Sequence, residues 1–402
     1  IDEGLNRVQK ALNWLAAQPE TDLHSQMRLT AVLGWPQMRA ISGLPSGADA
    51  WRATLAIAER IDDRDYQGRA LWALWVDAGN QGRAAEALDL ADRFAAVAAE
   101  TEDRLIARRF RAWSLASLGR LTESDAEIGS MLNDYRPLAR DAHLDRFQYD
   151  QRLVARITQV RGAWLLGRFD DAMAEAGAMV IDGLALDHTL TLAHVLSDAA
   201  CFLALWSGDA VEARRYIALL KEHTAIHALD VWRTYAEIFE AELQIREGLI
   251  DAALPRMREA MAKLEAGGFV LHHTLFETLL AQACLRAGQI ESALALMDKA
   301  QARCAATGEA WCLPEALRVR ALAQAARGDA AATFRAAIAL AREQGALFWE
   351  LRAAVSLARR EGSEEARSLL ADVLARCPQG EAVADRAEAV ALLGSLSRPI
   401  EA

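Results

Sequence analysis

Ionisable side chains gather in one segment of a chain otherwise rich in alanine and leucine: residues 143–161, HLDRFQYDQRLVARITQVR. We expect one helix here, beginning near Asp141, because Asp is a preferred N-cap residue. On a helical wheel that advances about 100° per residue, Phe147 and Trp164 mark an apolar arc. Arg152 and Arg156 fall opposite that arc, where we expect ordinary solvated charges. The arc itself also contains four ionisable residues: His143, Arg146, Asp150 and Arg161.

These four inward charges need partners, because an unpaired ion in a dry core costs several kcal/mol to desolvate. Arg146 and Asp150 are four residues apart and can pair on one helix face. Arg161 lies about 16 Å beyond Asp150, at about 1.5 Å per residue, and cannot share that pair. Two interpretations stay open. The charges form a satisfied structural network between neighbouring helix hairpins, or they line a wet groove that faces a ligand.

Other residues with suitable chemistry lie in segments that follow in the chain. Most tryptophans in such helices pack between repeats, but a minority beside Arg and His could bind a planar or anionic small molecule in the groove. The further candidates for this ligand-binding groove are His188, His194, Asp198, His227, Trp232, Trp311 and Glu315.

The motifs of common catalytic and metal sites are missing from the sequence. There is no GxxxxGK[ST] phosphate loop, no HExxH and no GxSxG. His223 and His227 have the spacing of a metal pair, but nothing nearby completes the three or four ligands that zinc needs. Five scattered cysteines form no CxxC pair and predict buried thiols. We therefore expect no metal, no cofactor and no enzymatic activity in this chain.

A repeated turn positions these residues. Its pattern is small–Gly–polar–x–x–acid–Ala, as in QGRAAEAL and AGQIESAL, and most copies are about 40 residues apart. Each glycine can end one helix in the left-handed conformation, and the acid that follows suits the start of the next helix. No segment shows the alternation of a strand. The turn glycines are Gly82, Gly119, Gly167, Gly208, Gly248, Gly288, Gly328 and Gly362.

These features predict an all-α fold, an α-solenoid superhelix of tetratricopeptide-like (TPR-like) hairpins with about 40 residues per repeat. Residues 1–62 lack a turn of this kind and are interpreted as an N-terminal helical cap, with helices near 5–18, 22–40 and 48–62. Residues 63–402 are interpreted as one continuous repeat array.

Composition limits the classes of partner. The formal net charge is −11, acidic and basic residues alternate, and no basic block is present to grip nucleic acid. No apolar run approaches the length of a membrane span, about 18 residues. The chain starts IDEGLNRVQK, without Met or signal peptide, so we expect a cytoplasmic fragment of a longer protein.

Five spaced blocks resemble a large family of bacterial multidomain regulators with a TPR-like C-terminal region. The blocks lie at 50–75, 143–156, 204–232, 307–323 and 348–374, and include RFQYDQR and ALWSGD. The resemblance covers roughly residues 5–395. It is greatest with the branch that carries an N-terminal winged-helix DNA-binding domain followed by an AAA/STAND-type ATPase module.

This resemblance implies that the chain is the signal-sensing arm of a transcriptional regulator. A small-molecule effector or a protein partner would bind in the concave groove and release the ATPase module of the parent protein. DNA and ATP would be bound by the parent, not by this fragment. The alternative is a protein–protein interaction scaffold without a small-molecule ligand.

Overall fold

The computed structural model describes residues 2–18, 22–38, 47–136, 144, 146–328 and 330–396, and every regular element in this part is helical. The all-α prediction is therefore confirmed. The helices are α1 (Asp2–Ala16), α2 (Leu23–Met38), α3 (Ala48–Arg60), α4 (Arg64–Asn80), α5 (Ala84–Val97), α6 (Thr101–Ser117), α7 (Leu121–Asp134), α9 (Gln151–Leu165), α10 (Phe169–Leu186), α11 (Thr189–Val195), the π-helical η1 (Leu196–Cys201), α12 (Phe202–Ser207), α13 (Ala210–His227), α14 (Asp230–Arg246), α15 (Ile250–Ala266), α16 (His273–Arg286), α17 (Ile290–Thr307), α18 (Leu313–Ala325), α19 (Ala331–Gln344), α20 (Leu347–Glu361), α21 (Glu364–Ala375) and α22 (Ala384–Leu396).

The helices form antiparallel hairpins joined at the glycine turns that the repeat predicts. Gly119 and Gly208, for example, have φ of +76° and +83°, the left-handed conformation that only glycine adopts without strain. Pairs such as α4–α5, α6–α7 and α16–α17 pack along their lengths. The solenoid of TPR-like hairpins is therefore confirmed.

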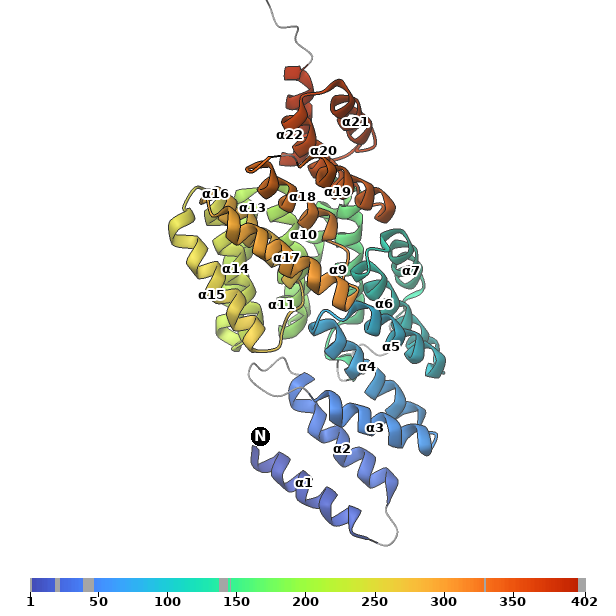
Figure 1. Ribbon diagram of the computed structural model, residues 1–402. Coiled ribbons are helices and arrows are strands. Elements are labelled where there is room, and N and C mark those ends of the chain that lie inside the picture. The colour runs from blue at the N-terminus through green and yellow to red at the C-terminus, as the bar shows by residue number, and fades with distance from the viewer. Residues whose placement is uncertain are drawn as a thin grey trace, which may run out of the picture.

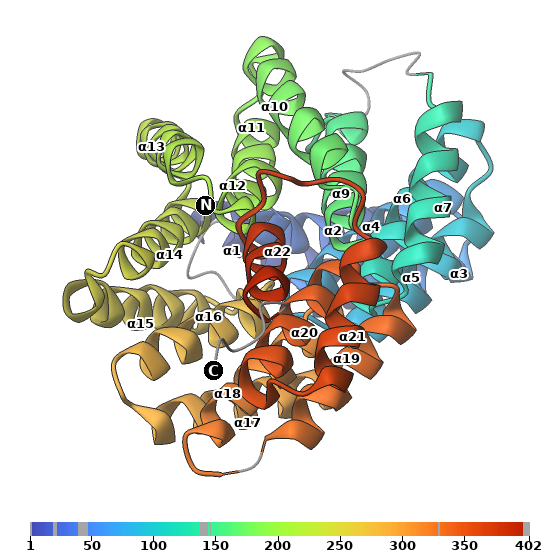
Figure 2. The same cartoon turned by 90° about the horizontal axis from the view of Figure 1, so that it is seen from above.

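The superhelix is wound so tightly that its second turn packs against its first (Figures 1 and 2). Loops that follow the later hairpins bond to the glycine turns of the early ones. The amide of Val270 donates to the carbonyl of Asn80 at 2.8 Å, and the amide of Ala310 donates to that of Ser117 at 2.8 Å. The amide of Gly380 reaches the carboxylate of Asp170, 210 residues away, at 3.1 Å. The middle of the array consequently has a packed interior and not an open channel.

Aromatic side chains fill that interior. Trp164 on α9 is fully buried and meets Phe348 on α20 edge to face, with ring centroids 5.4 Å apart. Trp206 contacts both rings and also Trp349. These contacts join helices of different superhelical turns, so the core of the protein runs through its axis. The expectation that most such tryptophans are core residues is confirmed for Trp75 and Trp206.

The first helices, α1 to α3, extend from one end of this body (Figure 1). Their bounds agree with the three predicted helices. A small apolar cluster of Met27, Ile57 and Ala58 holds α2 against α3, and α3 in turn packs on α4.

One continuous helical stretch, Thr189–Ser207, is long and apolar enough to cross a membrane when judged by length and composition alone. In the structure 83% of that window is buried by the rest of the chain. This is the position of a core helix, which is apolar on all sides because neighbouring helices surround it.

Contact between the superhelical turns can be tested at Gly380, whose φ is +86°. A Cβ there would lie 2.5 Å from Cδ2 of Phe169, a fully buried ring. Gly248 has a φ of +93° and nothing within 4 Å of its Cβ position, so it is a matched control. We expect Gly248→Ala to cost about 1–2 kcal/mol from backbone strain alone. Gly380→Ala should cost about 1–3 kcal/mol more in urea unfolding, because overpacking is added. Equal costs would contradict the inter-turn packing.

Candidate functional site

The segment that carries the inward charges is not one helix. Gln148 has a φ of +61°, and α9 begins only after Asp150, whose carboxylate caps it by accepting from the amide of Leu153 at 2.9 Å. The predicted continuous helix is therefore wrong. Asp is more favourable as an N-cap than in a helix interior, because its side chain forms hydrogen bonds with nearby backbone amides. Asp141 and His143 lie outside the described residues.

Two of the predicted charges, Arg146 and Arg156, have other surroundings than the helical wheel predicts. Arg146 does not pair with Asp150; it binds Asp103 at 2.8 Å and approaches Asp65 at 3.7 Å. Arg156, expected to be solvated, is mostly buried and forms ion pairs with two carboxylates of α10, Glu175 and Asp182. A helix that packs on both sides leaves few positions for a free charge. Arg152 is exposed, as predicted.

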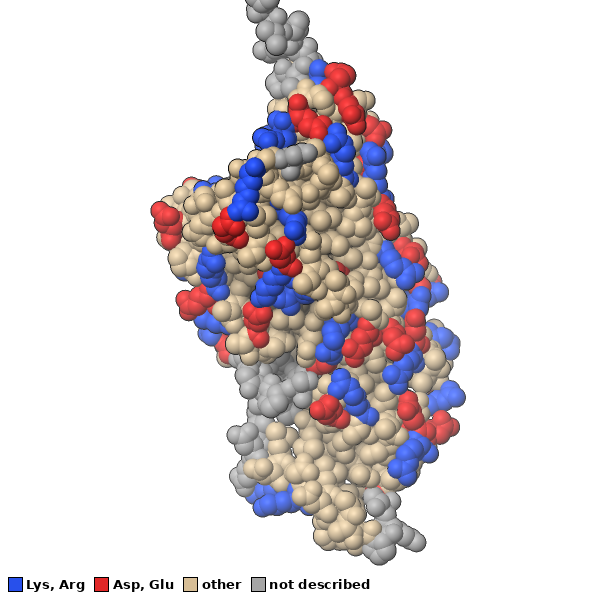
Figure 3. Space-filling view, viewed as in Figure 1, with Lys and Arg blue, Asp and Glu red and all other residues tan. Residues whose placement is uncertain are grey.

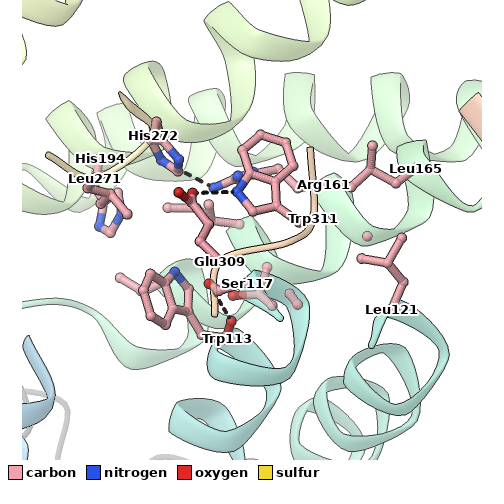
Figure 4. Close-up of a pocket in the computed structure, with 15 residues that line it drawn as sticks. Trp113, Ser117, Leu121, Arg161, Leu165, His194, Leu271, His272, Glu309 and Trp311 are labelled. Carbon is pink, nitrogen blue, oxygen red and sulfur yellow. Dashed lines mark hydrogen bonds between the residues drawn. The ribbon is translucent and has the colours of Figure 1, made fainter. Parts of the chain in front are cut away.

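Four of the predicted residues do converge: Arg161, His194, Asp198 and Trp311. All but Asp198 line a pocket of about 40 Å³ at the superhelical axis, and Asp198 bonds to groups on its wall. One side of the pocket comes from α6 and α9 of the first superhelical turn. The other comes from the loops around 271 and 309 of the second turn (Figure 4). A water molecule needs about 10–15 Å³ of such space, so the pocket in this state has room for about three waters.

Asp198 is the centre of the polar network beside this pocket. It sits in η1, the π-helical segment that interrupts Thr189–Ser207; such segments often occur at functional sites. Its carboxylate accepts from Nε2 of His272 at 2.6 Å and from the hydroxyl of Ser197. His194 approaches it at 3.7 Å and the guanidinium of Arg161 at 4.0 Å.

Burial and these neighbours determine the protonation states. Burial, together with the charge of Arg161, lowers the pKa of His272 to about 4, although Asp198 acts in the opposite direction. Burial alone would raise the pKa of Asp198, but His194, His272 and Arg161 outweigh it and lower the pKa overall. Burial also lowers the pKa of His194. At neutral pH, Asp198 is ionised and both imidazoles are neutral.

Because the imidazole of His272 is neutral, the N–H donors of Arg161 have few hydrogen-bond acceptors. Because Nε2 of His272 donates its hydrogen to Asp198, it cannot also accept from Arg161, which lies 3.4 Å from it. The guanidinium stacks over Trp311, 4.9 Å from the ring centroid, and over Phe202 at 5.4 Å. Its nearest carboxylate oxygen, on Asp198, is at 4.0 Å, beyond hydrogen-bond reach. A buried cation with spare donors therefore faces the pocket.

Glu309 closes the pocket from the second superhelical turn (Figure 4). Its carboxylate accepts from Thr274 at 2.5 Å and from the indole nitrogen of Trp311 at 2.9 Å. Burial raises the pKa of Glu309, and these two donors only partly offset the effect. The pocket thus offers a cation on one wall and an acid on the other.

The remaining predicted residues lie elsewhere. His188 caps α11, its Nδ1 accepting from the amide of Thr191 at 3.3 Å. His227 is exposed beside His223, and Trp232 is buried in the core. Glu315 is buried in a separate network, where it binds Arg318 and Arg352. Within the described residues, no group of three or more His, Cys, Asp or Glu could hold a metal ion.

The network does not have the geometry of a hydrolase. Ser197, Asp198 and His272 supply the residue types of a catalytic triad, but both the serine hydroxyl and the imidazole donate to the carboxylate. In a triad the imidazole lies between the other two groups and removes the proton of the serine. Ser197 is also fully buried. The arrangement suits binding and not nucleophilic attack.

The predictions missed two ionisable residues that line the pocket, His272 and Glu309. Both lie in loops between hairpins, His272 with a φ of +64° and Glu309 directly after the left-handed Gly308. A wheel drawn for single helices cannot place such residues. Their position in the sequence could have identified them. Each precedes the first helix of a repeat by a few residues, at the point where the superhelical turns contact each other.

Comparisons with known proteins give architectural likeness only. No family model matches this chain, and no curated protein matches it. The crystal structure of a Rap protein in complex with competence and sporulation factor is 12% identical, with 89% of this chain and 98% of that chain covered and a TM-score of 0.48. Yeast Tom70 is 11% identical, with coverages of 98% and 96% and a TM-score of 0.38. The Cut9–Hcn1 assembly of the APC/C is 14% identical, with coverages of 94% and 81% and a TM-score of 0.31.

Proposed function

We propose that this chain is a signal-sensing module in which a small polar effector binds at Arg161, between two turns of the superhelix. The observation that supports this most is the largely buried guanidinium of Arg161, which faces the pocket. Among the described residues its polar neighbour within hydrogen-bond range is Nε2 of His272, which itself donates to Asp198. Sites of this kind place a few polar groups among apolar and aromatic walls. Here the walls are Trp113, Trp311 and Leu165.

The position of the pocket explains how binding could be transmitted. An effector that accepts from Arg161 on α9 and contacts the Glu309 loop would bridge the two superhelical turns. It would then favour the tightly wound state over any looser one. A ligand shifts such an equilibrium only through its different affinity for the two states, and a bridging ligand has that difference.

The wider setting follows from the family resemblance. We propose that the chain is the regulatory arm of a bacterial, cytoplasmic transcriptional regulator, whose ATPase module and winged-helix domain belong to the parent protein. On the face shown in Figure 3, positive and negative side chains alternate without a basic patch, which fits a fragment that leaves DNA contact to another domain.

The test is a thermal-shift screen of polar metabolites against the chain and two matched variants. Arg161→Gln removes the cation at the pocket, whereas Arg152→Gln removes an exposed cation of the same helix. At least one compound should raise the Tm of the wild type and of Arg152→Gln by several degrees. The same compound should leave folded Arg161→Gln unchanged. A flat response of the wild type across the library would contradict the proposal, as would binding that survives in Arg161→Gln.

A second candidate function is a protein-interaction scaffold, and one feature favours it. A groove of about 490 Å³ lies between α16, α18, α20 and α22 at the C-terminal end. It is lined by five arginines against only two acids, although the whole chain is acidic. Arg318, Arg352 and Arg359 form ion pairs with carboxylates. Arg286 and Arg360 donate to backbone carbonyls, and their charges would suit an acidic partner segment. Such a scaffold would give the flat metabolite screen described above. The lining arginines are Arg286, Arg318, Arg352, Arg359 and Arg360.

A further inference from the structure

Arg109 on α6 is a buried cation that the site described above does not use. Only 3% of its surface is exposed. Its guanidinium lies over the rings of Phe110 and Trp75, at 4.7 Å and 5.1 Å from their centroids. It makes no hydrogen bond and no ion pair with any residue that the structure describes, and its Nε is enclosed without a partner.

The other arginines of α6 show how unusual this is. Arg104 donates to the carbonyl of Ala99, Arg108 to Asp134 and Ser130, and Arg111 pairs with Asp92 and Glu127. Those three side chains are more exposed than Arg109, so the free-energy cost of lacking a hydrogen-bond partner would be smaller for them. The most deeply buried arginine of the helix is therefore the one without an acceptor in the part of the chain that the structure describes.

Energetics argue against Arg109 as a purely structural residue. Desolvating a guanidinium costs several kcal/mol, and burial lowers the pKa of Arg109 to about 9. Cation–π contacts return about 2 kcal/mol when desolvated, but they satisfy none of its five N–H donors. Buried donors in folded proteins nearly always have an acceptor. Among the described residues, the enclosed Nε of Arg109 has no acceptor, so a partner is missing at this point.

Arg109 does not itself line the pocket at the superhelical axis, but it precedes lining residues on α6. It lies one helical turn before Trp113 and two turns before Ser117, on the same face of α6, and both of those residues line the pocket. His194 also lines the pocket, and the charges of both Arg109 and Arg161 depress its pKa. The ring of Tyr149 lies 5.4 Å from that of His194. Arg109 and Arg161 thus both lie close enough to His194 for their charges to act on it.

The chemistry around Arg109 identifies the missing partner as an anion. The ionisable groups that act on it are the phenols Tyr135 and Tyr149, and burial raises the pKa of both, so they stay neutral. Asp198 is already engaged by His272 and Ser197. A planar guanidinium with free donors matches the oxygens of a carboxylate or a phosphate.

We propose that Arg109 is the anchor of an oxyanion subsite, so that the effector is a small molecule with a carboxylate or phosphate group held by Arg109. This inference rests on the proposed sensing function and specifies its ligand class. The small volume of the pocket limits the ligand to a few heavy atoms unless the two superhelical turns move apart.

The test uses acetate, succinate, sulfate and inorganic phosphate as probes, at constant ionic strength made up with chloride so that general screening is equal. Tm and calorimetric affinity are measured for the wild type, Arg109→Met and Arg108→Met. Arg108 is the neighbouring arginine on another face of α6, and 41% of its side chain is exposed. At least one probe should raise the Tm of the wild type and of Arg108→Met. Arg109→Met should bind it at least tenfold more weakly. A response only to the carboxylates, or only to phosphate, would show which acidic group the effector carries.

The ligand-free variants give an independent measurement. If Arg109 serves a ligand, replacing an unpaired buried cation by an apolar side chain of similar length should leave the Tm unchanged or raise it. A large loss of Tm in Arg109→Met would assign a structural role and overturn the inference, as would unchanged probe affinity. If instead a neutral metabolite binds through Arg161 and no oxyanion binds, the sensing function stands and the oxyanion subsite fails.

Discussion

Replacing Trp164 by alanine is expected to lower the free energy of unfolding by about 3–5 kcal/mol, the usual cost of truncating a buried large aromatic side chain. Trp164 is fully buried where three aromatic residues of different hairpins meet it, at centroid distances of 4.9 Å to Phe169, 6.4 Å to Trp206 and 5.4 Å to Phe348. Because Phe348 belongs to the second superhelical turn, the loss should also loosen the stacking of the turns.

Two measurements check this. Urea unfolding gives the change in free energy, and small-angle X-ray scattering gives the radius of gyration, which should increase if the turns separate. Trp14→Ala is the matched control, because Trp14 is 64% exposed on α1; we expect a change within about 0.5 kcal/mol. A Trp164→Ala protein as stable and as compact as the control would mean that the axial aromatic core does not hold the turns together.

The parts of this fold that depend on local sequence could be predicted. The glycine turns specify where hairpins begin and end, because the left-handed conformation at Gly119 or Gly208 is readable from one residue and its neighbours. The stacking of superhelical turns could not be predicted, since it depends on the small rotation between successive repeats. Contacts such as that of Ala310 with Ser117 have no local signature.

The same distinction applies to the site. Arg161, His194 and Asp198 lie within helices, and the search for ionisable residues in these helices identified them. His272 and Glu309 reach the site only because another superhelical turn carries them there. The helical wheel placed Asp150 inside a continuous helix, although this Asp is the N-cap at which the helix begins. Arg109 was overlooked because an arginine without a partner cannot be recognised until its surroundings are known.

The free energy of unfolding is expected to fall as the pH is lowered from 7 towards 4. Burial, with the nearby cations Arg161 and Arg303, lowers the pKa of His272 and of His273 to about 4 in the folded chain, against about 6.5 when unfolded. The unfolded chain therefore binds more protons between these values, and stability rises with pH across the window. Each histidine should cost about 2 kcal/mol at pH 5 relative to pH 8.

Other ionisable groups also change how the free energy of unfolding depends on pH. Burial lowers the pKa of His194 and of His223 as well, so both add to the loss in acid. Glu309 has a raised pKa and opposes it, because its protonated form is favoured in the folded state. The lowered pKa of Asp198 contributes stability that is lost only below the usual aspartate pKa of about 3.8. Between pH 7 and pH 4.5 the histidines consequently dominate.

Urea unfolding from pH 8 to pH 4.5, in the wild type and in variants without a titrating imidazole, would measure this. His272→Asn keeps a residue that tolerates the left-handed conformation, and His273→Gln keeps a polar side chain in α16. Each should lower stability at pH 8 but reduce the acid-induced loss by about 2 kcal/mol. His227→Gln, at an exposed position, should leave the slope unchanged. An unchanged slope in the double variant would show that neither histidine is buried in neutral form, and the assignment of a neutral His272 donating to Asp198 would be wrong. A protonated His272 would still donate to Asp198 and could not accept from Arg161, so Arg161 would lie beside a second cation.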